Sequence, residues 1–190
     1  PTMDRHGYWI FTGLYPGTYR ITEESRAGWA HITPPSGEFF PVDISDNTQV
    51  TCGKFGNVPL ATISGYKFYD KDLDGLWDEL EPGIGGWTIL LQNNSIAWPS
   101  VWKTYASTTT ASNGYYQFTN VKPNPGMYRI TEVKKTVEWV MTTNPATLLI
   151  DLQKPLLPTT ITAKDIGNAL YARVEGVKFW DYKTQEKWPN

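Results

Sequence analysis

An internal repeat constrains the fold of this 190-residue chain more than any other feature of its sequence. Three pairs of matching segments define the repeat: GYWIFT at 7–12 and GYYQFT at 114–119, PGTYRITE at 16–23 and PGMYRITE at 125–132, and GYKFYD at 65–70 and GVKFWD at 176–181. The offset between matching positions is 107 for the first pair and 111 for the last. This spacing predicts tandem copies of one unit of about 110 residues.

The chain begins in the middle of a repeat unit. We predict that residues 1–61 are the C-terminal part of one unit, that 62–172 form a complete unit, and that 173–190 hold the first strand of a third. A lone strand is not stable by itself. One hypothesis is that the strand in 173–190 of one chain completes the 1–61 unit of the next copy, which gives a head-to-tail filament. The alternative is that the chain is a window of a longer tandem protein.

The local pattern within a unit is that of β-structure. Short runs of strand-forming residues alternate with turn sequences rich in Gly, Pro and Asn, such as 112–114, 122–126 and 143–145. No stretch shows helical periodicity of useful length. Several short strands in a unit of this size predict an all-β fold built of β-sandwich repeats.

The segment 70–81, DKDLDGLWDELE, has the spacing of a calcium-binding loop. Carboxylates at loop positions 1, 3, 5, 9 and 12 surround a glycine at position 6, so the predicted Ca²⁺ ligands are Asp70, Asp72, Asp74, Asp78 and Glu81. Ca²⁺ takes about six to eight oxygen ligands, and alternate residues of a tight loop can converge on one ion. The flanking residues favour strands over the helices of an EF-hand. An acidic, solvated turn is the alternative.

Four ordered motifs of the complete unit resemble the B-domain repeats of serine-aspartate repeat (Sdr) surface proteins. They are ISGYKFYDKDLDGLWDELEPGIGGW, TTTASNGYYQFTNV, PGMYRITEV and IGN. The unit is also similar to collagen-adhesin B-type (Cna-B-like) domains and transthyretin-like sandwiches. The resemblance implies immunoglobulin/transthyretin-like domains of an extracellular, prokaryotic cell-surface protein, strung as a stalk, sheath or filament and rigidified by calcium. The third unit departs from the pattern, because 181–188 lack the alternate acids.

The resemblance also implies a covalent crosslink. Related adhesin domains can join a lysine of the first strand to an asparagine of the last strand, beside a carboxylic acid. Residues two apart on a strand share a face, so Glu132 faces the core, Asn168 lies on the face of Ile166, and Lys67 lies on the face of Ile63. Burial favours a neutral, nucleophilic amine and a protonated acid that carries protons to the departing ammonia. The alternatives are a buried Lys–Glu ion pair beside the asparagine, or a lysine that reaches the surface.

The first unit repeats two of these three residues. Glu23 shares the apolar face of Tyr19 and Ile21, and Asn57 shares the face of Phe55. In the third unit Lys178 corresponds to Lys67 and needs an acid and an amide elsewhere in the sequence or in another chain.

Composition excludes several functions. The net charge of −2 with interspersed signs predicts no binding to nucleic acid or to an anionic membrane. No apolar run is long enough for a membrane span, and no signal peptide is evident, so any targeting segment for export lies outside this chain. The single Cys52 cannot form an internal disulfide. His6 and His31 are isolated and predicted to lie at the surface; with no nucleophile motif beside them, we predict that the chain is not an enzyme.

Aromatic residues support the main alternative function. The chain has nine Trp and eleven Tyr, which could form core, a subunit interface or a sugar-stacking surface. In a carbohydrate-binding or adhesive module for surface glycans, Trp87, Trp98 and Trp102 would be the candidates. An accessory domain of a secreted enzyme is a third hypothesis. The sequence Asn93-Asn94-Ser95 is a potential N-glycosylation site.

Overall fold

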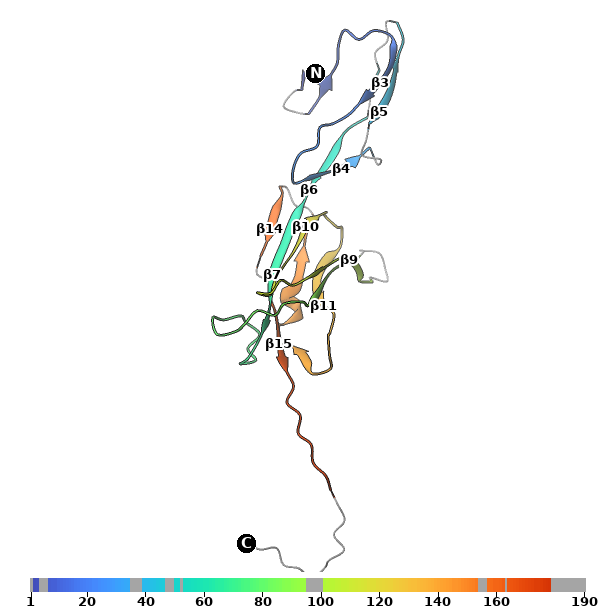
Figure 1. The fold of residues 1–190 in the computed structure, drawn as a ribbon. Helices are drawn as coiled ribbons and strands as arrows, with labels where there is room; N and C mark the ends of the chain where they lie inside the picture. Colours follow the sequence, from blue (N-terminus) through green and yellow to red (C-terminus); the bar gives the residue numbers. More distant parts are fainter. Residues whose placement is uncertain are drawn as a thin grey trace, which may run out of the picture.

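The computed structural model describes residues 2–3, 7–34, 39–46, 50–51, 53–94, 101–153, 157–162 and 164–178. Within these ranges the only helix is the 3-10 turn η1 (Pro145–Leu148), and all other regular elements are strands. The predicted all-β fold is therefore confirmed. Figure 1 shows an elongated molecule in which the N-terminal strands, the central unit and an extended C-terminal segment follow one another.

The central unit is a sandwich of two sheets. Its strands are β7 (Ala61–Tyr69), β8 (Thr88–Asn93), β9 (Lys103–Thr109), β10 (Tyr115–Val121), β11 (Met127–Glu132), β12 (Trp139–Met141), β13 (Leu149–Asp151), β14 (Thr159–Ile161) and β15 (Ile166–Leu170). One sheet has the order β10-β7-β15-β12, with β14 also paired to β7, and the other has the order β13-β11-β8-β9. Strands β14 and β15 run parallel to β7, whereas the other ladders are antiparallel.

The core lies between the two sheets and follows the two-residue period of the strands. In β11 the buried side chains are Tyr128 and Ile130, and in β8 they are Ile89 and Leu91. Because alternate residues of a strand point to opposite faces, this spacing puts one apolar row of each strand into the core. Glu132 follows Ile130 on the same face of β11.

Strand β7 is buried on both of its faces. Its inner residues pack into the core, whereas the ring of Trp77, from the loop that follows β7, covers the outer side chains. The ring centroid of Trp77 lies 4.4 Å from that of Tyr66 and 6.2 Å from that of Phe68. Both rows of β7 side chains are apolar for this reason. The sequence alone therefore does not clearly show which face of β7 points into the core.

The N-terminal unit consists of paired strands with little core. Its strands are β1 (Thr2–Met3), β2 (Trp9–Ile10), β3 (Gly17–Ile21), β4 (Trp29–Thr33), β5 (Phe40–Ile44) and β6 (Gly56–Pro59). They pair as β1-β2, β3-β5 and β4-β6. The ladders β3-β5 and β4-β6 correspond to β11-β13 and β12-β15 of the central unit. Among the described residues before Ala61, the buried apolar side chains are those of Val42, Pro34 and Pro59.

Residues 171–178 leave the central unit as an extended, exposed segment at the end opposite to the N-terminal unit (Figure 1). Val174 is 97% exposed and Val177 is 90% exposed. The side chains of Val174 and Val177 are therefore not packed against the described part of the chain.

Candidate functional site

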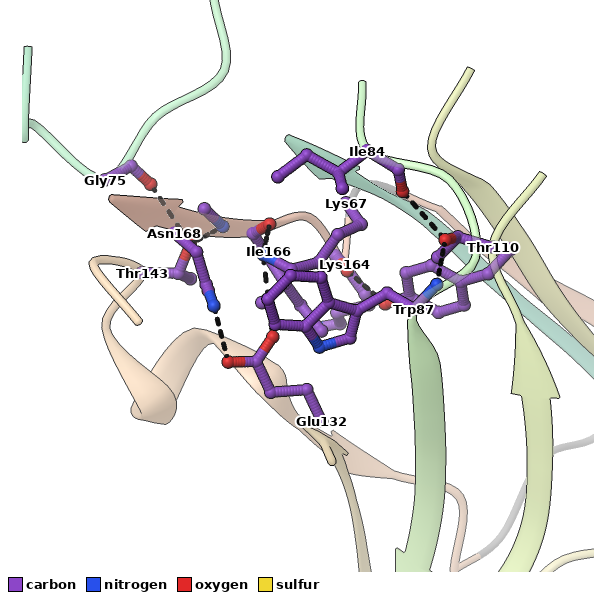
Figure 2. Close-up of polar contacts among 12 residues, drawn as sticks. Lys67, Gly75, Ile84, Trp87, Thr110, Glu132, Thr143, Lys164, Ile166 and Asn168 are labelled. Atoms are coloured by element: carbon purple, nitrogen blue, oxygen red, sulfur yellow. Dashed lines mark hydrogen bonds and ion pairs between the residues drawn. The ribbon is translucent and has the colours of Figure 1, made fainter. Parts of the chain in front are cut away.

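A buried polar cluster joins the two sheets of the central unit. It contains Lys67 of β7, Glu132 at the end of β11, and Asn168 of β15. The Lys67 Nζ lies 3.5 Å from Oε2 of Glu132, and the Asn168 Nδ2 donates a hydrogen bond of 2.8 Å to Oε1 of the same carboxylate (Figure 2). Lys67 and Asn168 are completely buried, and the Glu132 side chain is 7% exposed. The structure thus brings together the three residues that the parity of the strands placed on inner faces.

The strand pairing explains this convergence. In the parallel ladder Ile166 lies opposite Lys67, and Asn168 lies one inward position further along β15. The Lys67 Nζ also donates to the carbonyl oxygen of Ile166 at 3.1 Å. The indole of Trp87, itself 1% exposed, covers the amine, with Nζ 4.7 Å from the ring centroid. The sequence analysis did not assign Trp87 to this site. Its position directly after the glycine-rich turn at 83–86 could have indicated that its side chain packs near that turn.

The burial of Lys67 makes its neutral amine easier to form than in water. Burial lowers the pKa of Lys67 from 10.5 to about 8, and the neighbouring Glu132 opposes part of that shift. Oε2 of Glu132 and Oδ1 of Asn168 are buried without a hydrogen-bond partner. One carboxylate oxygen therefore faces the amine while the other accepts from the amide nitrogen. A carboxyl group in this position can carry a proton from Nζ to the Nδ2 of Asn168.

The lowered pKa predicts a pH dependence of stability in a chain without a crosslink, such as Asn168→Ala. Between about pH 8 and pH 10.5 the unfolded chain holds a proton on Lys67 that the folded chain has released, so the free energy of unfolding rises with pH. The rise attributable to this group is at most about 3 kcal/mol. Urea unfolding of Asn168→Ala and of Lys67→Met/Asn168→Ala measures it, since the second variant lacks the amine. Parallel pH profiles for the two variants would contradict the assignment.

The N-terminal unit contains a second acid–amide pair. The Asn57 Nδ2 donates to Oε1 of Glu23 at 2.7 Å, as Asn168 does to Glu132. Oε2 of Glu23 and Oδ1 of Asn57 are buried without a hydrogen-bond partner. The Nδ1 of His31 lies 3.8 Å from Oε2 of Glu23, and the His31 side chain is only 17% exposed. The prediction that His31 is a surface residue was wrong, because its strand position turns it toward this carboxylate; His6 lies outside the described residues.

The acidic loop brings three of its five predicted ligands together. Carboxylate oxygens of Asp70, Asp72 and Asp74 all lie within 4.8 Å of one another. Burial alone would raise the pKa of Asp70, but hydrogen bonds from Thr142 and from the N–H groups of Gly75 and Leu73 hold it below its ordinary value. Gly75 adopts a φ of +78°, which a glycine at this turn permits. The all-oxygen donor set fits Ca²⁺.

The other two predicted ligands lie outside this group. Oε1 of Glu81 accepts from the Lys71 N–H at 2.7 Å, and Oε2 accepts from the Asp78 N–H at 3.4 Å. Asp78 itself is exposed and accepts from the N–H of Leu80. In the structure, these two carboxylates accept hydrogen bonds from backbone N–H groups.

The sugar-stacking candidates do not form an exposed row. Trp87 is buried in the core, so its prediction as a sugar-binding residue was wrong. Trp102 is half-buried, and its ring lies 4.4 Å from the guanidinium carbon of Arg129. Trp98 and Ser95 lie outside the described residues, and the half-buried Asn93 belongs to β8. Cys52 is also outside them.

Comparison with known proteins finds a family match within the central unit. Residues 61–149 match the SdrD B-like domain family. Serine-aspartate repeat-containing protein C of Staphylococcus aureus is 31% identical over 140 residues in strains N315 and Newman; the match covers 68% of this chain and 14% of each relative. The chain therefore spans a small part of the length of these relatives.

Solved structures share a partial likeness with the chain. The full-length major pilin SpaD of Corynebacterium diphtheriae has a TM-score of 0.41 at 13% identity, covering 57% of this chain and 32% of the pilin. The Bacillus anthracis TIE protein has a TM-score of 0.44 at 14% identity, covering 88% of this chain and 28% of that protein. In the part of the chain that the structure describes, no helix is long and apolar enough to cross a membrane.

Proposed function

We propose, from the match of residues 61–149 to the SdrD B-like domain family, that the repeats of this chain are mechanical elements stiffened by covalent crosslinks and by calcium. The match to this family and to serine-aspartate repeat-containing protein C supports a structural, extracellular repeat protein of the cell surface and not an enzyme.

The observation that supports the crosslink is the buried contact of Lys67, Glu132 and Asn168. The neutral Nζ of Lys67 attacks the Cγ of Asn168, the new C–N bond forms, and the Cγ–Nδ2 bond breaks. Glu132 carries one proton from the amine to Nδ2, which leaves as ammonia. The reaction needs no oxidant, which suits a chain with a single cysteine.

The crosslink joins the first and last strands of the unit. Strands β7 and β15 are neighbours in one parallel ladder, in which Lys67 belongs to the first residue pair and Asn168 to the last. Tension that enters along β7 and leaves along β15 therefore passes through the isopeptide bond and bypasses the chain between the two residues.

Single-molecule stretching of the 1–190 chain tests this function. In the wild type the chain between positions 67 and 168 is expected to stay closed at forces that unfold ordinary sandwiches. Lys67→Ala and Asn168→Ala are each expected to release about 100 further residues, roughly 330–360 Å of contour length. The substitution Lys103→Arg serves as the matched control, because Lys103 is an exposed lysine on β9. Equal extension of all four chains would contradict the proposal.

Calcium is the second proposed stiffener, held by Asp70, Asp72 and Asp74 with Asp78 and Glu81 as further ligands. A bound cation would remove the mutual repulsion of clustered carboxylates and tie the loop after β7 to the sandwich. The proximity of the first three carboxylates supports this assignment.

Calcium is expected to raise the free energy of unfolding of the 1–190 chain by about 2.7 kcal/mol when its concentration is a hundred times the dissociation constant. Urea unfolding with calcium and with excess chelator measures the increment. Asp72→Asn/Asp74→Asn should abolish it, because these exposed side chains keep their shape and lose their charge. Glu79→Gln, an exposed acid outside the predicted ligand set, should retain it. An increment that survives in the double variant would exclude this loop as the site.

A further inference from the structure

The acidic loop and the buried polar cluster of the central unit share a backbone contact. The N–H of Asp70, the first predicted calcium ligand, donates a hydrogen bond of 3.0 Å to the main-chain carbonyl oxygen of Asn168. Both residues are completely buried, and Asp70 directly follows β7, the strand that carries Lys67. The loop therefore begins at the point of the sandwich where the amide of the cluster is held.

Thr143 makes a second contact between the loop and the strand of Asn168. Its Oγ1 accepts a hydrogen bond of 2.7 Å from the N–H of Gly167 and donates one of 3.4 Å to the carbonyl oxygen of Gly75, at the turn of the loop (Figure 2). Thr143 is only 6% exposed, and the proposed crosslinking mechanism does not use its hydroxyl. The hydroxyl thus connects the turn of the acidic loop to the residue that precedes Asn168.

Gly167 is packed too closely for a side chain. A Cβ atom at this position would lie 2.6 Å from Cζ of Phe68 and 2.7 Å from Oγ1 of Thr142. The carbonyl oxygen of Gly167 also accepts a hydrogen bond of 2.9 Å from the N–H of Thr142. Because close-packed groups transmit displacement, a shift of the segment 142–143 moves Gly167 and the neighbouring Asn168 with it.

The carboxylates of the loop control the shape of its turn. The carboxylate of Asp70 accepts hydrogen bonds from the N–H groups of Leu73 at 2.7 Å and of Gly75 at 2.8 Å. The carboxylates of Asp72 and Asp74 lie within 4.8 Å of that of Asp70, and like charges at this distance repel one another. A bound cation removes the repulsion and therefore favours the turn seen at Gly75.

We propose that Thr143 is a positioning residue for the crosslink and that, together with Asp70, it makes the crosslinking rate depend on calcium. When the loop is closed, the Thr143 hydroxyl holds the N–H of Gly167 and the Asp70 N–H holds the carbonyl oxygen of Asn168. The main chain is then fixed on both sides of the Asn168 side chain, and its Cγ stays within reach of the Lys67 amine. When the carboxylates repel one another, both contacts weaken. The inference rests on the crosslink and the calcium site proposed above, and the bonds made and broken are those already given.

The rate of ammonia loss after refolding of the 1–190 chain tests the proposal, followed by intact mass with calcium and with excess chelator. Calcium is expected to raise the wild-type rate by about 5- to 150-fold, the usual range of coupling between two sites. Thr143→Val keeps the shape of the side chain without its hydroxyl and should react at nearly the same rate under both conditions. Thr143→Ser should restore the calcium dependence. Thr104→Val, at an exposed position on β9, should behave as the wild type does.

A purely structural role for Thr143 gives a different result. In that case Thr143→Val would slow the reaction by the same factor with calcium and with chelator, and the ratio of the two rates would stay at its wild-type value. That outcome would contradict the positioning role.

Hydrogen exchange in Lys67→Met, which cannot crosslink, measures the contacts themselves. Calcium is expected to slow the exchange of the N–H groups of Asp70 and Gly167, because it suppresses the local opening of the loop. The N–H of Asn94, bonded to the carbonyl oxygen of Met127 in the other sheet, should exchange at an unchanged rate.

The outcomes separate this inference from the crosslink on which it rests. If the wild type loses ammonia between Lys67 and Asn168 equally fast with calcium and with chelator, the coupling is overturned and the crosslink stands. Exchange of the Asp70 and Gly167 N–H groups that calcium does not slow would also overturn the coupling. A wild-type chain that keeps its full mass under both conditions overturns the crosslink and, with it, this role of Thr143.

Discussion

Replacing Glu132 with alanine is expected to lower the free energy of unfolding by about 3–5 kcal/mol relative to Lys67→Met/Glu132→Gln. Glu132→Ala leaves the completely buried amine of Lys67 without its carboxylate. The double variant removes both charges, and the glutamine side-chain oxygen that it introduces at position 132 can still accept from the Asn168 amide. Neither variant can form the isopeptide bond, so the difference between them reports the unpaired amine of Lys67 together with the loss of the acceptor for the Asn168 amide. Urea unfolding at pH 7 measures it.

The single variant Lys67→Met completes this comparison. It leaves the carboxylate of Glu132 buried with the Asn168 N–H as its remaining partner. Its stability should fall between those of the other two variants. Equal stability of Glu132→Ala and the double variant would mean that Lys67 reaches solvent, which contradicts the buried cluster.

Replacing Trp87 with alanine is expected to cost about 3–5 kcal/mol of unfolding free energy in a chain that lacks the crosslink. The side chain is 1% exposed, and its ring meets that of Trp139 edge-on at a centroid distance of 5.5 Å. Its removal leaves a large cavity beside the Lys67 amine. The comparison is made by urea unfolding of Asn168→Ala with and without Trp87→Ala.

The same substitution should slow crosslinking in the chain that retains Asn168. Water that enters the cavity moves the pKa of Lys67 back toward 10.5, so less of the amine is neutral at pH 7. The rate of ammonia loss after refolding is expected to fall by up to about three hundredfold. Trp87→Phe should react nearly as fast as the wild type, since it keeps an apolar cover and the indole N–H has no hydrogen-bond partner to lose. An unchanged rate in Trp87→Ala would show that the Trp87 ring does not exclude water from the Lys67 amine.

The repeat and the strand period account for much of what could be predicted from the sequence. One apolar row in β11 ends at Glu132, so its inward direction follows from counting residues. Counting residues could not decide which face of β7 carries Lys67 inward. Trp77 covers the outer face of β7, so both rows of side chains are apolar. Only the tertiary contact with Glu132 identifies the inner row.

Other parts of the site depend on pairings between distant segments. The parallel ladder of β7 with β15 joins residues about 100 positions apart, and no local pattern encodes its register. The burial of Trp87 over the amine follows from the packing of the two sheets. His31 looked isolated because its partner Glu23 comes from another segment of the chain, two residues beyond the end of β3. A signal was present in the repeat itself, since copies of Glu132 and Asn168 occur in the first unit as Glu23 and Asn57.

The intact mass of the 1–190 chain under denaturing conditions tests the central claim most directly. The crosslink predicts that each chain is short by one ammonia for the central unit, that Lys67→Ala restores the full mass, and that fragmentation locates the link between Lys67 and Asn168. An unmodified mass in the folded wild-type chain would contradict the claim and leave Lys67, Glu132 and Asn168 as a buried ion pair with a hydrogen-bonded amide.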